Sequence, residues 1–352
     1  MDAEIVIPRR LWNRLRSHLL IDKEESRKGK VDEQLAFLLA GKSVDSKRVR
    51  LLVREILPAH SENLEYQSGI GVAPKQDFVI KALNRCQAEG WQLIEVHSHP
   101  FDSSPSTTFS GIDWGNDRRK MPALSTLSTE PFLHATMVMG RNSADAHFYD
   151  SVTREIKPVS RIVIIGVENS GSRNALERVP TTSGNMEHEY GASGEVKHQR
   201  QQAVLGTDGQ RALTQSTIAV IGLGGLGSFV TLELAHLGVG RLILIDPDVI
   251  EVSNLNRLLG AGMAENGRRK VEFYKDVASG VSPATEVVPV GASILQEDAL
   301  SRAKEADLLV GCVDNHGARL ILNQLAIRYL LPLVDGGAGI TLERYHLNLA
   351  EQ

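Results

Sequence analysis

The stretch "TIAVIGLGGLGSFV", residues 217–230, joins an apolar run to a cluster of glycines. Its first five residues are mostly apolar and β-branched, which is typical of a buried strand. Glycine has no Cβ, so the main chain that follows can approach a ligand closely and offer backbone N–H groups at a helix start to phosphate. The stretch therefore predicts a strand, a phosphate-binding loop and a helix, with the glycines of the loop at Gly222, Gly224, Gly225 and Gly227.

Further strand-like runs follow at regular intervals and alternate with helix-length segments. This alternation is typical of a parallel sheet that is covered by helices on both faces. We therefore expect an α/β domain over residues 198–352, with a Rossmann-like, mostly parallel sheet. The runs are "RLILIDPD" (241–248), "ATEVVPV" (284–290), "ADLLVGCVD" (306–314) and "PLVDGG" (332–337).

Asp246 stands at the end of the strand that follows the glycine loop. A carboxylate at this place can accept hydrogen bonds from ribose hydroxyls, as in proteins that bind a dinucleotide. The glycine pattern and Asp246 thus fit an NAD-binding redox protein as well as other nucleotide-binding proteins. A tight turn between strand and helix, without a ligand, is the third interpretation.

The segment before this domain has a different pattern. Residues 1–168 begin with Leu11, Leu15 and Leu19 at helical spacing and continue with short β-rich runs, so we expect an α+β domain. Residues 169–197 are rich in Ser, Gly, Asn and charged residues and carry no periodic apolar face. We predict that they form an exposed linker between the two domains.

Composition restricts the setting. The 352 residues, 42% of them hydrophobic, suffice for two cores, and a net charge of -4 gives no strong field for nucleic acid or membrane phosphates. We therefore expect neither a nucleic acid nor a membrane as partner. Two cysteines, Cys86 and Cys312, are too few for a disulfide framework, which fits a cytoplasmic protein. No signal peptide and no run of eighteen apolar residues is visible.

A second candidate site lies in the stretch "EVHSHPFDSSPSTTFSGID", residues 95–113. In a strand, His97 and His99 share one face, so both imidazoles can point at one metal ion. Asp113 is the natural third ligand, because two histidines and a carboxylate leave the fourth position of a catalytic zinc open for water. Ser110 opens the helix that carries Asp113 and can donate a hydrogen bond to an oxyanion. A chance pair of strand histidines is the alternative interpretation.

Three motifs after the glycine loop, "DPDVIEVSNLNR", "GRRKVE" and "GCVDN", resemble those of the ThiF/MoeB/HesA adenylyltransferases and of the adenylation domain of ubiquitin-activating enzymes. The resemblance implies ATP and magnesium as cofactors. It implies that Asp246 binds the ribose, that Asp314 binds magnesium, and that the phosphates are contacted by Asn254, Arg257 and Lys270. Cations there would offset the charge that develops on the departing pyrophosphate.

Upstream of the loop, "QRQQAVLGTDGQRAL" looks like the leading helix of that family, whose arginine reaches the nucleotide of the neighbouring subunit. The resemblance nominates Arg200 for this role and implies a homodimer through the adenylation domain; a solvated helix face is the alternative. The longer members continue with a reactive cysteine or C-x-x-C motifs after the stretch that resembles "PLVDGGAGI". We therefore expect a truncated or minimal activating domain, with Cys312 as a packing residue.

The order His-x-His-Pro followed by Ser-x-x-Asp resembles the motif of the JAMM (MPN+/JAB) zinc isopeptidases and metallopeptidases. The resemblance implies zinc, a JAB/MPN-like fold, and an upstream glutamate as general base. "VDEQLAFLLAG" nominates Glu33 as that base, with Glu55 and Glu95 as weaker candidates. A free carboxylate beside zinc can take a proton from water and pass it to the leaving amine.

The two resemblances imply one substrate, a ubiquitin-like or ThiS-like β-grasp protein that ends in Gly-Gly. The first domain would cleave peptide or isopeptide bonds at its C-terminus, and the second would adenylate the carboxylate. A ubiquitin-conjugating-type protein or a sulfur carrier would act next. The alternatives are an NAD-binding redox protein fused to a metallopeptidase, and a non-catalytic scaffold that only binds the modifier.

Overall fold

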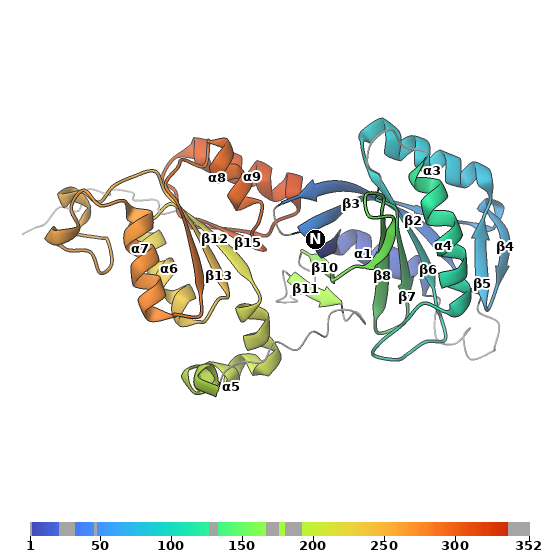
Figure 1. Ribbon diagram of the computed structural model, residues 1–352, viewed down its shortest axis with the longest axis horizontal. Coiled ribbons are helices and arrows are strands. Elements are labelled where there is room, and N and C mark those ends of the chain that lie inside the picture. The colour runs from blue at the N-terminus through green and yellow to red at the C-terminus, as the bar shows by residue number, and fades with distance from the viewer. Residues whose placement is uncertain are drawn as a thin grey trace, which may run out of the picture. The chain divides into compact units, whose positions relative to one another are not determined.

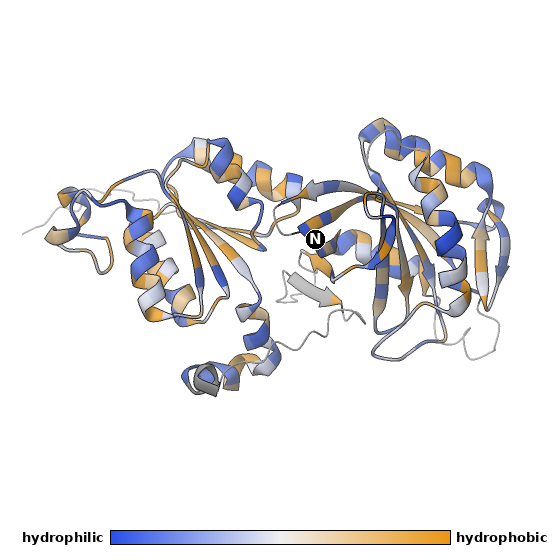
Figure 2. Ribbon diagram, viewed as in Figure 1, coloured by the Kyte–Doolittle hydropathy of each residue, from blue (hydrophilic) through white to orange (hydrophobic). Residues whose placement is uncertain are grey.

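The computed structural model describes residues 2–20, 32–45, 48–126, 133–166, 176–179 and 192–336. The chain divides into two compact units, Met1–Tyr190 and Gly191–Gln352. Strands of both units are largely apolar, whereas the helices carry apolar and polar faces (Figure 2). No helix in the described part of the chain is long and apolar enough to cross a membrane.

The second unit is built on a parallel sheet (Figure 1). Its strand order is β14-β13-β12-β15-β16, and each neighbouring pair is parallel. The chain therefore starts in the middle of the sheet, winds to one edge and then crosses to the other. The strands are β12 (Thr217–Ile221), β13 (Arg241–Ile245), β14 (Glu286–Val290), β15 (Leu308–Gly311) and β16 (Leu333–Asp335).

Helices cover both faces of this sheet, as expected for a Rossmann-like domain. On one face, α6 (Gly225–His236) and α7 (Lys270–Val281) enclose a core that contains Val220, Leu244 and Tyr274. On the other, α8 (Glu297–Ala303) and α9 (His316–Tyr329) enclose a second core. Alternate residues of β12 point into opposite cores, so the strand is apolar along its whole length. The unit begins with α5 (Ala192–Thr214), which is interrupted at Gly206.

The first unit is built on a mixed sheet, in which nine strands of the described residues follow the order β11-β10-β1-β3-β2-β6-β7-β8-β9. A separate hairpin pairs β4 with β5. The bounds are β1 (Asp2–Pro8), β2 (Leu35–Val44), β3 (Arg48–Pro58), β4 (Leu64–Ser68), β5 (Gly71–Pro74), β6 (Gln92–Ser98), β7 (Ala135–Met139), β8 (Ala144–Asp150), β9 (Glu155–Pro158), β10 (Arg161–Ile165) and β11 (Leu176–Val179).

Three helices of the described residues pack on this sheet. α1 (Arg9–Leu19) buries Trp12, Leu15 and Leu19 on one face, in a core with the β1, β2 and β3 side chains. α3 (Gln76–Glu89) packs on the other face against Phe37 and Leu93. α4 (Gly111–Ser125) covers the neighbouring part of the sheet, near β8. The α+β character expected from the sequence agrees with this arrangement of mixed strands and helices.

The expected linker is partly structured. Residues 176–179 form β11, which pairs antiparallel with β10, and Val179 is buried. α5 begins at Ala192, also inside the expected linker. Side chains alternate between the two faces of a strand, and four residues are too few to show this alternation as a periodic apolar signal in the sequence. The other residues of the segment, apart from those of α5, lie outside the described part of the chain.

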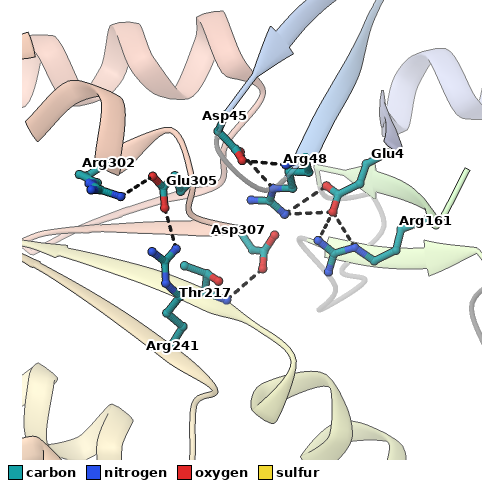
Figure 3. A network of polar contacts seen from close by, with 9 residues as sticks. All are labelled: Glu4, Asp45, Arg48, Arg161, Thr217, Arg241, Arg302, Glu305 and Asp307. Atoms are coloured by element: carbon teal, nitrogen blue, oxygen red, sulfur yellow. Dashed lines mark hydrogen bonds and ion pairs between the residues drawn. The ribbon is translucent and has the colours of Figure 1, made fainter. Parts of the chain in front are cut away.

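Each sheet holds an ion-pair network around a buried side chain, Glu4 in the first unit and Arg241 in the second (Figure 3). In the first unit, the Glu4 carboxylate accepts from Arg48 Nη1 at 3.0 and 3.2 Å and from Arg161 Nε at 2.9 Å. In the second, Arg241 donates to Glu305 at 2.8 Å and to Glu286 at 3.1 Å. Pairing offsets the cost of removing these charges from water.

The first core should be sensitive to a cavity in β2. Leu38 is fully buried, whereas Val44 on the same strand is 54% exposed. Leu38→Ala is expected to lower the free energy of unfolding by about 2–5 kcal/mol, and the control Val44→Ala by less than about 0.5 kcal/mol. Urea unfolding followed by tryptophan fluorescence measures this unit alone, because all three tryptophans lie in it. Equal losses in both variants would contradict the packing described here.

Candidate functional site

The glycine loop of the second unit lies at the point where the chain changes direction in the sheet, between the ends of β12 and β15. Gly222 has a φ of 89°, and a Cβ there would stand 2.7 Å from the Cys312 carbonyl oxygen. A Cβ on Gly227 would stand 1.8 Å from the Gly222 carbonyl oxygen. Both positions therefore require glycine, because the loop folds tightly before α6 begins at Gly225. Ligands of such sheets bind at this crevice.

Asp246, which follows β13, holds the loop in place. Its Oδ2 accepts a hydrogen bond from the Leu223 N–H at 2.6 Å, and its Oδ1 accepts from Asp248 N–H at 2.8 Å. Burial raises the pKa of Asp246, although these bonds and the charge of Lys270 act in the opposite direction. Lys270, buried at the start of α7, places its Nζ 2.9 Å from Asp248 and 3.8 Å from Asp246. The structure thus brings the predicted ribose and phosphate residues to one edge of the sheet.

Three other predicted residues lie along the same edge. The Arg257 side chain packs 3.3 Å from the place of a Cβ on Gly225, and its Nη1 donates to the Ser253 carbonyl oxygen at 3.1 Å. Asn254 ends a short 3₁₀ turn and is partly exposed. Asp314 is exposed in the loop after β15, next to the strand that carries the glycine loop. A hard cation or a polyphosphate can reach all three from solvent.

Arg200 lies exposed on α5. Among the described residues, no hydrogen bond or ion pair joins its guanidinium to the glycine loop. The role in a neighbouring subunit's site stays a prediction.

The first unit brings together His97, His99 and Asp113. Their ligand atoms lie within 4.8 Å of one another, and each imidazole Nε2 is 3.4 Å from an Asp113 oxygen. The Nε2 atom of His97 is buried and has no hydrogen-bond partner. An orphaned imidazole nitrogen facing a carboxylate and a second imidazole is the donor set that zinc prefers, so these residues fit the metal.

Asp113 is fixed by the start of α4. Ser110 caps the helix: its Oγ accepts from the Asp113 N–H at 3.2 Å, and its own N–H donates to Asp113 Oδ2 at 2.7 Å. Burial alone would raise the pKa of Asp113, but the nearby imidazoles of His97 and His99 and the Ser110 cap hold that pKa well below its usual range. Asp113 is therefore a charged ligand held in one orientation. The Ser110 hydroxyl caps the helix here, and its role at an oxyanion stays a prediction.

Glu33 lies beside this trio. It precedes β2, which pairs with β6 so that Leu35 stands opposite His97. Glu33 Oε1 is 4.0 Å from His99 Nε2, and burial raises the pKa of its carboxyl group. Its backbone N–H donates to the Ser68 carbonyl oxygen of β4 at 2.8 Å. A buried carboxyl group of raised pKa next to a metal-ligand cluster suits a general base.

The two weaker candidates for the base are placed differently. Glu55 forms an ion pair with Arg85 of α3, at 3.4 Å, and does not join the trio. Glu95 lies on the same face of β6 as the histidines, but Lys120 Nζ contacts its Oε1 at 2.5 Å. The geometry therefore favours Glu33.

A cavity of about 690 Å³ opens beside the trio. It is lined by Glu33, His97 and Asp113 together with polar residues that were not predicted as site residues, among them Asp117, Lys120 and Thr136. Asp117 and Lys120 stand in a polar run of α4, whereas Thr136 is the polar residue of the apolar strand β7. The sequence signal for Asp117 and Lys120 is that they follow Asp113 by four and seven residues. This helical spacing places the three side chains on one face of α4.

Comparison with known proteins finds similarity over the second unit. Residues 197–341 match the ThiF family. The chain is therefore similar to ThiF-family proteins in this part. Its relatives include the molybdopterin-synthase adenylyltransferase of Escherichia coli, 37% identical over 131 residues, which are 37% of this chain and 53% of that protein. Another is the probable adenylyltransferase/sulfurtransferase MoeZ of Mycobacterium tuberculosis, 35% identical over 132 residues, 38% of this chain and 34% of that protein.

The chain thus spans about half or less of the length of these relatives. A solved structure of Escherichia coli tRNA N6-threonylcarbamoyladenosine dehydratase, TcdA, with AMP matches 45% of this chain and 65% of its own, with 24% identity and a TM-score of 0.41. The Rossmann-like sheet expected for the second domain is confirmed, and the ThiF match supports the expected similarity over residues 197–341. The expected JAMM/MPN domain stays a prediction.

Both cysteines are held as thiols. Burial and the charge of Glu55 raise the pKa of Cys86 to about 12, and burial and the charge of Asp335 raise the pKa of Cys312 to about 11. Cys312 packs, partly buried, against the core of the second unit, as expected for a packing residue.

Neither cysteine is expected to react with iodoacetamide in the folded protein at pH 8, because fewer than roughly one thiol in five hundred is ionised. In urea both pKa values return to the ordinary range, and both thiols should be alkylated within minutes. Peptide mass spectrometry follows each site separately. Native labelling of Cys312 at the rate seen in urea would show that it is an accessible thiolate.

Proposed function

We propose that the second unit adenylates a C-terminal carboxylate with ATP and magnesium. The glycine loop at the point of reversal in the sheet, with Asp246, Lys270 and Asp314 around it, is the observation that carries this proposal. The similarity to adenylyltransferases over residues 197–341 supports it.

Each residue has a role that follows from its charge and place. The loop N–H groups and the start of α6 bind the phosphates, and Asp246 holds the loop and accepts from the ribose. Lys270 and Arg257 offset the charge of the leaving pyrophosphate, while Asn254 hydrogen-bonds to the phosphates. Asp314, exposed at the sheet edge, offers the hard oxygen ligand that magnesium prefers.

ATP binding with and without magnesium tests this site in the full chain. Asp314→Asn is expected to weaken magnesium-dependent ATP binding about tenfold, because one ionic ligand is lost. Asp298→Asn, an equally exposed change on α8, is the matched control and should leave binding unchanged. Isothermal titration calorimetry measures both. Tight binding of NAD, insensitive to magnesium, would contradict the proposal and favour a redox protein.

We further propose that the first unit is a zinc-dependent peptidase or isopeptidase. His97, His99 and Asp113 would hold the ion, whose chemistry when bound is to polarise water and a scissile carbonyl. Glu33 would accept the proton of the water at its carboxylate and deliver it to the leaving amine. The Ser110 hydroxyl, at the start of α4, would donate to the oxyanion. The resemblance of "HSHP" and "SGID" to the JAMM motif supports this assignment.

Removal of a ligand and removal of the base should have different effects. The purified full chain is expected to hold one zinc ion per molecule, and His97→Ala is expected to hold none. The control is His236→Ala, which changes an exposed histidine on α6 and should leave one zinc ion per molecule. Glu33→Gln should keep the metal and lose at least about a hundredfold in hydrolysis. Metal analysis and peptide cleavage assays measure both properties. Equal zinc in His97→Ala, or full activity in Glu33→Gln, contradicts the assignment.

We propose that both units act on one class of substrate, a ubiquitin-like or ThiS-like β-grasp protein with a C-terminal Gly-Gly. The peptidase would expose or release this terminus and the second unit would adenylate it. A conjugating protein or a sulfur carrier would then take up the activated carboxylate, because neither buried thiol of this chain is ionised at neutral pH.

A further inference from the structure

A layer of polar side chains lies between α4 and the sheet of the first unit. The register places Glu95 of β6 opposite Thr136 of β7, and Thr136 opposite His147 of β8, so the three form one row across the sheet. All three are buried. On the same face, α3 packs against apolar side chains such as Phe37, the partner of Glu95 on β2. Polar residues therefore replace the apolar layer only under α4.

Charged residues of α4 complete this layer. Lys120 Nζ contacts Glu95 Oε1 at 2.5 Å and Asp117 Oδ1 at 3.7 Å. The other oxygen of Asp117 pairs with His147 Nε2 at 2.8 Å. Burial alone would lower the pKa of Lys120, but the two carboxylates outweigh it and raise that pKa. One ammonium thus faces two carboxylates. Buried charges of this kind cost stability, and they cluster at functional sites.

The layer is open to the cavity of about 690 Å³ beside the metal-ligand trio, because Glu95, Lys120 and Thr136 line it. The opposite wall is the hairpin of β4 and β5, with Tyr66, Ile70 and residues 71–74. The Thr136 side chain is 1% exposed, and its Oγ1 has no hydrogen-bond partner. A buried hydroxyl that lines a cavity without a partner is a group that a ligand can satisfy.

Charge selects the class of ligand. The polar layer carries the carboxylates of Glu95 and Asp117 and the ammonium of Lys120. An entering carboxylate would therefore add a third negative charge at low dielectric. An apolar group would leave the Thr136 hydroxyl unsatisfied. A guanidinium or ammonium group can donate to Glu95 and to Thr136 together. Arg119, which also lines the cavity, is turned back along α4 and donates to the Gly115 carbonyl oxygen at 3.2 Å and to Asn116 at 2.9 Å.

The distance from Asp113 to the polar layer also suits a side chain of a bound peptide. Asp113 and Lys120 are separated by seven residues of one helix, which corresponds to about 10 Å along the axis. An extended peptide covers that distance in about three residues. A long side chain of a substrate residue near the scissile bond can therefore reach the polar layer.

We infer that this groove is a specificity subsite that takes an arginine or lysine side chain of the substrate, within three residues of the scissile bond. The inference rests on the proposed peptidase function of the first unit. Glu95 is the residue that would determine the preference, and Thr136 would complete the hydrogen bonding.

A random mixture of eight-residue peptides tests the subsite with the zinc-loaded full chain. Peptides cleaved by the unmodified protein, and peptides retained by immobilised Glu33→Gln protein, are sequenced by mass spectrometry. Arg and Lys are expected about tenfold above the input mixture near the cleaved bond and among retained peptides, with Asp and Glu depleted. Glu95→Gln should abolish this enrichment in both readouts. Glu89→Gln, an exposed change on α3, is the matched control and should preserve it.

Lys120→Met supplies a second variant, because it leaves two carboxylates without their cation and should increase the enrichment of basic residues. Cleavage without basic enrichment, or enrichment unchanged in Glu95→Gln, would overturn the subsite and leave the peptidase intact. Retention of basic peptides that depends on Glu95, without any cleavage, would support the subsite and refute the peptidase. Neither cleavage nor enrichment would refute both.

Discussion

The hydrogen-bonded register of parallel strands is the constraint on which the second unit depends. Ile221 pairs with Ile245 on one side and with Gly311 on the other, so three strands end at one edge of the sheet. Everything that follows those ends, from the glycine loop to Asp246 and Asp314, is held there by backbone bonds. The Gly222 N–H donates to the Ile245 carbonyl oxygen, and the Cys312 N–H to that of Ile221. Side chains can then remain exposed to a ligand without losing their place.

In the first unit, the candidate site residues are positioned by contacts among separate segments of the chain. β6 presents His97, His99 follows the last residue of that strand and donates its backbone N–H to Met139, and the capping box of α4 supplies Asp113. Glu33 comes from a third segment and is tied to the β4–β5 hairpin by its backbone. Strand, cap and hairpin each fix one member of the cluster, so the cluster depends on packing among all three.

This difference explains what the sequence could predict. The loop at residues 217–230 and the trio of His97, His99 and Asp113 are local patterns of strand, cap and glycine, and the structure brings their members together. Glu33 was nominated only by resemblance, because its place depends on the long-range pairing of β2 with β6. The sequence of β11 gave no strand signal, because four residues are too few to show a periodic apolar pattern. The polar row of Glu95, Thr136 and His147 requires the register of three strands, which no local spacing reveals.

Buried charge has opposite consequences in the two sites. In the second unit, the Asp246 carboxylate accepts hydrogen bonds from two backbone N–H groups, so it is part of the frame that holds the glycine loop. In the first, Lys120 is held between two carboxylates while the Thr136 hydroxyl beside it lacks a partner. A frame whose polar groups are all paired gains little from a ligand, whereas an incompletely paired layer gains hydrogen bonds when one binds. The incomplete polar layer therefore lies in the unit for which we propose selection among peptide side chains, where a bound side chain would gain those hydrogen bonds.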